Sequence, residues 1–208
     1  MSILFADKIS AGRIQKPDGG QFEEWILLRQ HTITSTTGAH HTFYLTEFLK
    51  EFDALKLVIN DLTNTTDGKA FYIQVGGSEL DTVVGGNYNY AEIGNWAGAA
   101  DNSLSTAATR GQTWGSMGSG IGPLGNDAKA VGCGEYIFPN WKSTVGYKRM
   151  YGFSQIYTNS NYVSSRNIVG CWRNTSPIEI IRFGDLDTNT MDGGDVSIYG
   201  SRLTNGNR

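Results

Sequence analysis

The sequence predicts an all-β domain, an antiparallel β-sandwich of jelly-roll type. Three observations point to this fold class. Short apolar runs bounded by Gly, Ser and Thr recur along most of the 208 residues, and some of them alternate between apolar and polar positions. The chain has 27 glycines and only four prolines, which suits many tight turns. The chain shows no repeat period and almost no helical pattern, which also favours an all-β fold. Within that class, a closed barrel is the main alternative to the sandwich.

Residues 1–24 are predicted to form an extended arm, and residues 25–208 a single sandwich domain. Pro17 and several glycines interrupt the arm, and its apolar residues follow no sustained period. An arm of this kind is poorly suited to lying free in water, so it either docks on a neighbouring subunit or another protein or packs across its own sandwich. The candidate partner-binding residues are Ile3, Leu4, Phe5, Ile9 and Ile14.

Five strands are expected in the first half of the sandwich. They cover residues 25–34, 41–45, 55–62, 69–75 and 87–90. The fourth run alternates, with Phe71, Ile73 and Val75 on one face. Because Asp67-Gly68 precedes it, we predict that it forms a hairpin with the third run. Residues 45–55 fit either a short helix or an extended crossover.

The second half is expected to begin with a long excursion over residues 94–132. This stretch is rich in Gly, Ala, Ser and Asn and should hold at most one or two short strands. A loop of that length usually has a function or is ordered by a partner. Five further strands follow, over residues 133–138, 147–157, 167–172, 178–183 and 195–199.

Charge and hydropathy exclude several classes of partner. The net charge is −3 and no basic run occurs, so we expect no nucleic-acid partner. No segment approaches the roughly 18 apolar residues of a membrane span, and the N-terminus has no signal-peptide pattern. We therefore expect synthesis in the cytoplasm of the cell that produces the chain, and no membrane partner. Cys133 and Cys171 are expected to be free buried thiols rather than a disulfide.

Catalytic motifs are not evident, and the chain is predicted not to be an enzyme. His40 and His41 should point to opposite faces of a strand, so they cannot readily share a metal ion. A metal site formed by His31 and His41 across a pair of strands is the less favoured alternative. The glycine-rich stretch from Gly115 to Gly125 lacks the Gly-Lys-Ser/Thr ending of a phosphate-binding loop. The glutamates have no spacing typical of a hydrolase.

One acidic segment resembles a calcium loop only in part. Oxygen-bearing side chains alternate in it, but the glycine and glutamate of the EF-hand order are missing. We favour a polar turn, with calcium as the weaker alternative and the single candidate cofactor. The candidate ligands are Asp185, Asp187, Asn189 and Asp192.

Two segments resemble a domain of tailed-bacteriophage virion proteins. The first runs from Phe52 to Gly68 and continues into the strand up to Val75 and the pair Tyr88 and Tyr90. The second runs from Ile178 to Phe183 and closes with Gly193-Gly-Asp-Val-Ser-Ile-Tyr-Gly200. The resemblance covers roughly residues 25–200 and leaves the arm and the 94–132 excursion unexplained.

The resemblance implies a phage virion structural protein with a jelly-roll-like module, often trimeric. The short chain favours a capsid decoration or cement protein that binds other virion proteins, in the first place the major capsid protein. The alternative is a tail-fibre or receptor-binding module that recognises host surface carbohydrate, because aromatic rings in loops stack on sugars. An interface would explain the same aromatic residues, which are Trp96, Trp114, Trp141 and Tyr162.

Overall fold

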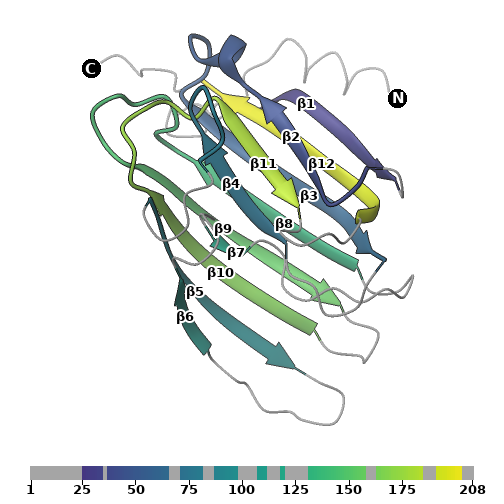
Figure 1. The fold of residues 1–208 in the computed structure, drawn as a ribbon. Coiled ribbons are helices and arrows are strands. Elements are labelled where there is room, and N and C mark those ends of the chain that lie inside the picture. The colour runs from purple at the N-terminus through teal and green to yellow at the C-terminus, as the bar shows by residue number, and fades with distance from the viewer. Residues whose placement is uncertain are drawn as a thin grey trace, which may run out of the picture.

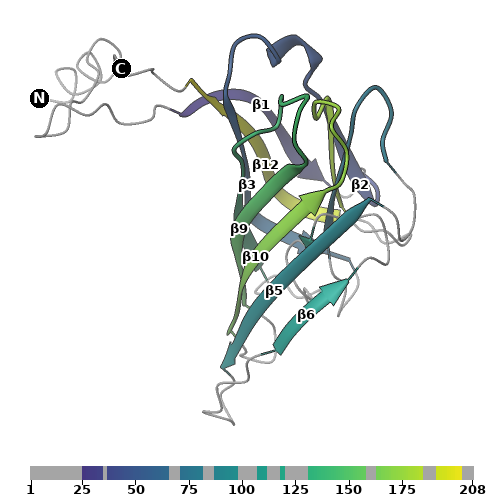
Figure 2. The same ribbon diagram turned by 90° about the vertical axis from the view of Figure 1, so that its left-hand side faces the viewer.

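The computed structural model describes residues 25–34, 37–65, 71–81, 87–97, 107–111, 118–119, 131–157, 163–184 and 191–202. They form two antiparallel β-sheets that lie face to face (Figures 1 and 2). The expected all-β, antiparallel fold is confirmed. In the described part of the chain both sheets end in edge strands, so they do not close into a barrel there. No helix in this part is long and apolar enough to cross a membrane.

The larger sheet has eight strands in the order β1-β12-β3-β8-β9-β10-β5-β6. Their bounds are Trp25–Thr34 for β1, Met191–Ser201 for β12, Ala54–Asn64 for β3, Val131–Phe138 for β8, Lys148–Tyr157 for β9, Val163–Trp172 for β10, Tyr88–Ala97 for β5 and Ala107–Gly111 for β6.

The smaller sheet has four strands in the order β2-β11-β4-β7. Their bounds are His40–Tyr44 for β2, Ile180–Gly184 for β11, Tyr72–Gly76 for β4 and Gly118–Ser119 for β7. A single 3-10 turn, Thr46–Phe48, lies between β2 and β3. The expected short strands of the 94–132 excursion are β6 and β7.

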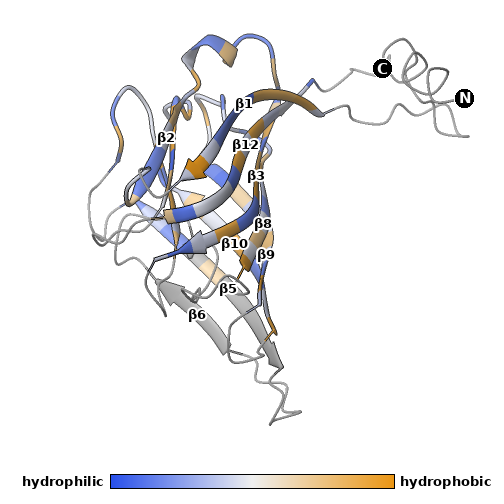
Figure 3. Ribbon diagram, turned by 90° about the vertical axis from the view of Figure 1, so that its right-hand side faces the viewer, coloured by the Kyte–Doolittle hydropathy of each residue, from blue (hydrophilic) through white to orange (hydrophobic). Residues whose placement is uncertain are grey.

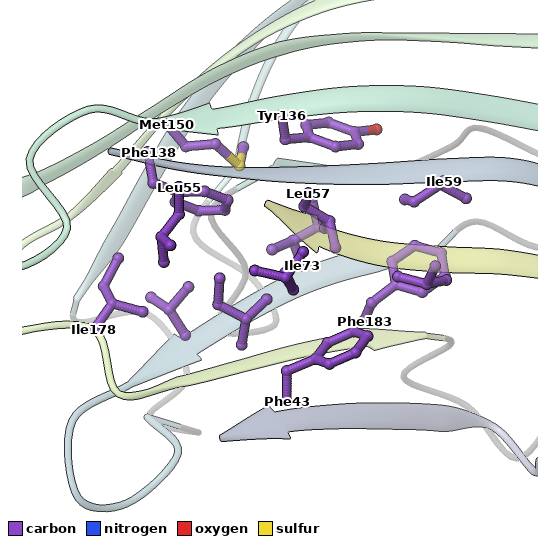
Figure 4. Packing of buried hydrophobic residues seen from close by; sticks show 14 of the residues in the cluster. Phe43, Leu55, Leu57, Ile59, Ile73, Tyr136, Phe138, Met150, Ile178 and Phe183 are labelled. Atoms are coloured by element: carbon purple, nitrogen blue, oxygen red, sulfur yellow. The ribbon is translucent and has the colours of Figure 1, made fainter. Parts of the chain in front are cut away.

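The core lies between the two sheets and draws side chains from both. Leu57 of β3 and Tyr136 of β8 lie on the inner side of the larger sheet, opposite Phe43 and Phe183 of the smaller one (Figure 4). Phe183 also stacks on Phe71, with ring centroids 5.6 Å apart. All five of these residues are buried. Burial of such large apolar side chains is the main stabilising contribution to a two-layer β fold.

A glycine makes room for the largest ring on β8. Tyr136 lies against Gly152 of the neighbouring strand β9, where an added Cβ would come within 2.6 Å of the tyrosine ring and 2.3 Å of the Glu135 carbonyl oxygen. The missing side chain therefore lets the ring of Tyr136 lie close to the sheet.

The predicted hairpin between residues 55–62 and 69–75 is wrong. β3 pairs with β12 and β8 in the larger sheet, whereas β4 pairs with β11 and β7 in the smaller one. The chain therefore crosses from one sheet to the other between these strands. An Asp-Gly pair is a local signal, but strand partners are decided by long-range burial, and both edges of β3 are taken by other strands. Asp67 and Gly68 themselves lie outside the described residues.

Candidate functional site

The outer face of the larger sheet, which points away from the core, carries rows of apolar side chains. One row runs across four strands, from Ile137 on β8 through Tyr151 and Val169 to Ala91 on β5. A second row joins Val131, Tyr157 and Val163. Directly paired side chains on one face of a sheet lie about 5 Å apart, so each row forms a continuous surface.

The first row borders a shallow hollow of about 500 Å³ on this face. Phe153 also lines it, next to Glu135 and Asn167 in the neighbouring row. Tyr151 is 48% exposed and Val169 is 60% exposed. We call Ala91, Ile137, Tyr151, Phe153 and Val169 the outer patch. Large exposed apolar residues gathered in this way mark a binding surface more often than single exposed ones do.

Charged and aromatic residues border the outer patch on its β3 side. The Lys56 ammonium lies 3.5 Å from the Glu135 carboxylate. It also lies over two rings of the same face, 4.7 Å from the centroid of Trp25 and 5.7 Å from that of Tyr199. The apolar surface therefore has a polar border, the arrangement that protein interfaces usually have.

The edge strands β1 and β2 of the two sheets lie at the open side of the sandwich (Figure 3). Residues of both strands line a second concave surface there. It has a volume of about 340 Å³, and we call it the edge cleft. From β1 it is lined by Arg29 and His31, and from β2 by His41 and Tyr44. Glu47, in the 3-10 turn, completes it and forms an ion pair with Arg29.

The two histidines of the edge cleft stack on each other. The ring centroids of His31 and His41 are 3.6 Å apart and the rings are nearly parallel, at 6°. Because ring nitrogens bind metals in the plane of the ring, two stacked imidazoles do not converge on one ion. Burial, followed by the nearby His31 and His40, lowers the pKa of His41 to about 4. This ring is therefore uncharged at neutral pH.

Polar groups near the core form hydrogen bonds within the fold. The Asp81 carboxylate accepts hydrogen bonds from the Trp172 indole and the Asn87 amide, each at 2.8 Å. The Lys148 ammonium donates to three backbone carbonyls, those of Gly146, Asn174 and Thr175. These contacts join loops to strands, which is a structural role.

Only one of the four aromatic candidates can be placed by its side chain, and that prediction is wrong. Trp141 lies in the loop after β8, but its ring is fully buried and its indole N–H donates to the Phe52 carbonyl oxygen at 3.3 Å. A buried ring cannot stack on a sugar. Burying the indole removes a large apolar area from water while its polar group stays satisfied. Trp96 lies in β5 with only its backbone described, and Trp114 and Tyr162 lie outside the described residues.

Most of the other predicted site residues also lie outside the described part of the chain. These are the arm residues Ile3, Leu4, Phe5, Ile9 and Ile14, and the calcium candidates Asp185, Asp187 and Asn189. Asp192 is exposed at the start of β12. Among the described residues, no three His, Cys, Asp or Glu side chains gather as metal ligands. Cys133 and Cys171 are free thiols, as predicted, but they are not buried as expected, since Cys133 is exposed and Cys171 is half-buried.

The sequence reasoning missed the exposed residues of both concave surfaces. Tyr151 and Phe153 alternate with buried positions along β9, and Tyr44 closes the run His-His-Thr-Phe-Tyr on β2. A strand with apolar residues on both of its faces could have indicated this surface. When one face packs into the core, the other apolar face must be exposed or covered by a partner.

Comparison of the chain with protein-family models, with curated proteins and with solved structures found no match.

Proposed function

We propose that this chain is a virion structural protein that works by binding, a capsid decoration or cement protein docked through the outer patch. The observation that carries the proposal is the exposed apolar surface on β5, β8, β9 and β10, centred on Tyr151 and Phe153. The resemblance to phage virion proteins supports the location and adds the jelly-roll type, the trimer and the major capsid protein as partner. Localisation on the virion and the absence of an enzymatic activity belong to the same proposal.

The composition of the outer patch suits a protein partner. Aromatic residues are enriched at the centres of protein interfaces, and a few of them usually supply most of the binding free energy. Tyr151 and Phe153 are two residues apart on β9, so both side chains point outward from the same face of the sheet. The bordering pair Lys56 and Glu135 adds groups that fix orientation at the rim.

The experiment is to image labelled protein on intact virions. We expect regular density over the capsid lattice, and density at the tail alone would contradict the decoration role. A variant with Tyr151→Lys and Phe153→Lys should be folded but should no longer attach. The matched control is Val145→Lys, at a loop position that is 90% exposed, which should attach like the unchanged protein.

A tail-fibre or receptor-binding module that recognises host carbohydrate is the second candidate. The observation in its favour is the edge cleft, whose lining includes the ion pair of Arg29 and Glu47 and the stacked histidines, which are groups that can hydrogen-bond to a sugar. Imaging separates the two roles, since a receptor-binding module would be found at the tail.

A further inference from the structure

The outer face of the smaller sheet lies on the opposite side of the molecule from the outer patch, because the core separates the two sheets. In this sheet β11 runs between β2 and β4 (Figure 1). Ile181 and Phe183 of β11 are buried in the core. Since side chains alternate along a strand, Arg182 points away from the core, to the outer face. A protein docked through the outer patch leaves this face uncovered.

Arg182 carries a charged donor that the fold does not satisfy. Its Nε atom is buried and has no hydrogen-bond partner within the described part of the chain. None of the ion pairs formed among the described residues includes Arg182. The carboxylate of Glu179, three positions earlier, accepts a hydrogen bond from the Thr46 hydroxyl instead. A guanidinium is always charged and can only donate, so its buried N–H requires an acceptor from outside the described fold, such as a water or an ion.

The neighbours of Arg182 make its surroundings dry on one side and open on the other. Thr42 of β2 and Gln74 of β4 pair directly with Arg182, so their Cβ atoms lie about 5 Å from its own on the same face. Gln74 is only 4% exposed. Thr42 is half-buried, and His40, the preceding residue of β2 on this face, is exposed. The guanidinium can therefore be reached from the β2 side, while the shielded β4 side strengthens its attraction for an anion.

His40 lies close enough to Arg182 to sense its charge. Burial, followed by the positive charge of Arg182, lowers the pKa of His40 from its ordinary value of 6.5. His41, the next residue of β2, has a pKa of about 4. Both rings are therefore uncharged at neutral pH, and the positive charge at this place is that of Arg182. A neutral imidazole still has one N–H that can donate to an acceptor.

We propose that Arg182 binds an oxyanion group of a small ligand, a phosphate or a carboxylate, with the Thr42 hydroxyl and the His40 ring as further donors. The planar fork of a guanidinium matches two oxygens of either group. The bound oxyanion supplies the acceptor that the buried Nε lacks. This site is independent of the role of the outer patch.

The test is an NMR titration of the His40 ring protons with pH in the full chain. It is made in sodium sulfate, in sodium formate and in sodium chloride at equal ionic strength. Sulfate has the tetrahedral shape of phosphate and keeps its charge over this pH range, and formate represents a carboxylate. An anion bound beside Arg182 favours the protonated ring, so sulfate or formate should raise the pKa of His40 above its value in chloride.

Variants of Arg182 assign this response to the guanidinium. Arg182→Gln should abolish it, and in chloride the pKa of His40 should rise, because a charge that lowers it is removed. Arg182→Lys keeps the charge but loses the fork, so it should bind the anion about tenfold more weakly. The matched control is Arg202→Gln, since Arg202 pairs with Glu51 at the surface, and this variant should respond like the unchanged protein.

Urea denaturation separates a binding residue from a structural one. Without anion, Arg182→Gln should be at least as stable as the unchanged protein, because it removes an unpaired, partly buried charge. A large loss of stability would overturn the proposal by showing that Arg182 serves the fold. An equal response of Arg182→Gln to the anions would also overturn it, and so would a response to neither sulfate nor formate beyond that to chloride. A response to one of the two supports the proposal and identifies the shape of the oxyanion.

Discussion

The strands β3 and β9 lie two positions apart in the same sheet, and they differ on the face that points away from the core. On the inner side both are buried, through Leu57 on β3 and Met150 on β9. On the outer side β3 carries Lys56, Val58 and Asn60, whereas β9 carries Tyr151, Phe153 and Tyr157 together with Arg149 and Gln155. The fold itself does not require aromatic residues there, since the outer face of β3 has none and is compatible with the sheet. The aromatic outer face of β9 is therefore best explained by binding.

The largest effect should come from the inner face of β3. Leu57→Ala removes a fully buried side chain and leaves a cavity between the sheets, so we expect a loss of about 3 kcal/mol in the free energy of unfolding. Urea denaturation measures it. Val58→Ala, on the outer face of the same strand, should cost about 1 kcal/mol or less. Equal losses for the two variants would contradict the burial difference between the faces.

A charged residue on the inner side of β9 should matter almost as much. Lys148 is fully buried and its ammonium satisfies three backbone carbonyls, so Lys148→Ala leaves these carbonyls without their donor. We expect a loss of about 2 to 3 kcal/mol, measured by urea denaturation. Lys142→Ala is the control, because Lys142 pairs with Asp53 at the surface and should cost about 0.5 kcal/mol. A loss that small for Lys148→Ala would show that water replaces the ammonium.

His41 should make the stability of the protein depend on pH. Burial lowers the pKa of His41 in the native state to about 4, against an unfolded value of 6.5. Between these two pKa values His41 binds more protons in the unfolded chain than in the folded one. The contribution of His41 to stability is therefore present above pH 6.5 and is lost as the pH falls toward 4. Because the ring is partly solvated, we expect about 1 kcal/mol. The unfolding temperature should fall less between pH 7.5 and pH 4.5 for His41→Gln than for the unchanged protein. An equal fall in both proteins would contradict the assignment of this effect to His41.

The smallest effect on stability should come from the outer patch. Tyr151→Ser and Phe153→Ser alter side chains that are about half exposed, so we expect each to change the free energy of unfolding by about 0.5 kcal/mol or less. Attachment to virions, measured by cosedimentation, should nevertheless be lost. If either variant unfolds the protein, these residues serve the fold; if attachment persists, docking uses another surface.

Part of the candidate site could be predicted from the sequence. The sequence places His31 and His41 on two strands, and a metal site shared by them is its less favoured alternative. Their stacking depends on two edge strands of different sheets meeting at the open side, which no local pattern encodes. The aromatic residues show the same limit: Trp141 was expected to be exposed and is buried, whereas Tyr44 and Tyr151 were missed and are exposed.

The positions of many strands follow from the local pattern of residues. Runs such as 25–34, 133–138 and 147–157 match β1, β8 and β9 closely, because alternation and turn residues are properties of neighbouring positions. The tertiary structure decided which strands pair, which sheet each one joins, and which apolar face remains uncovered. The physical reason is that pairing and burial depend on contacts between distant segments, so β3 and β4 separate into different sheets despite the Asp-Gly pair between them.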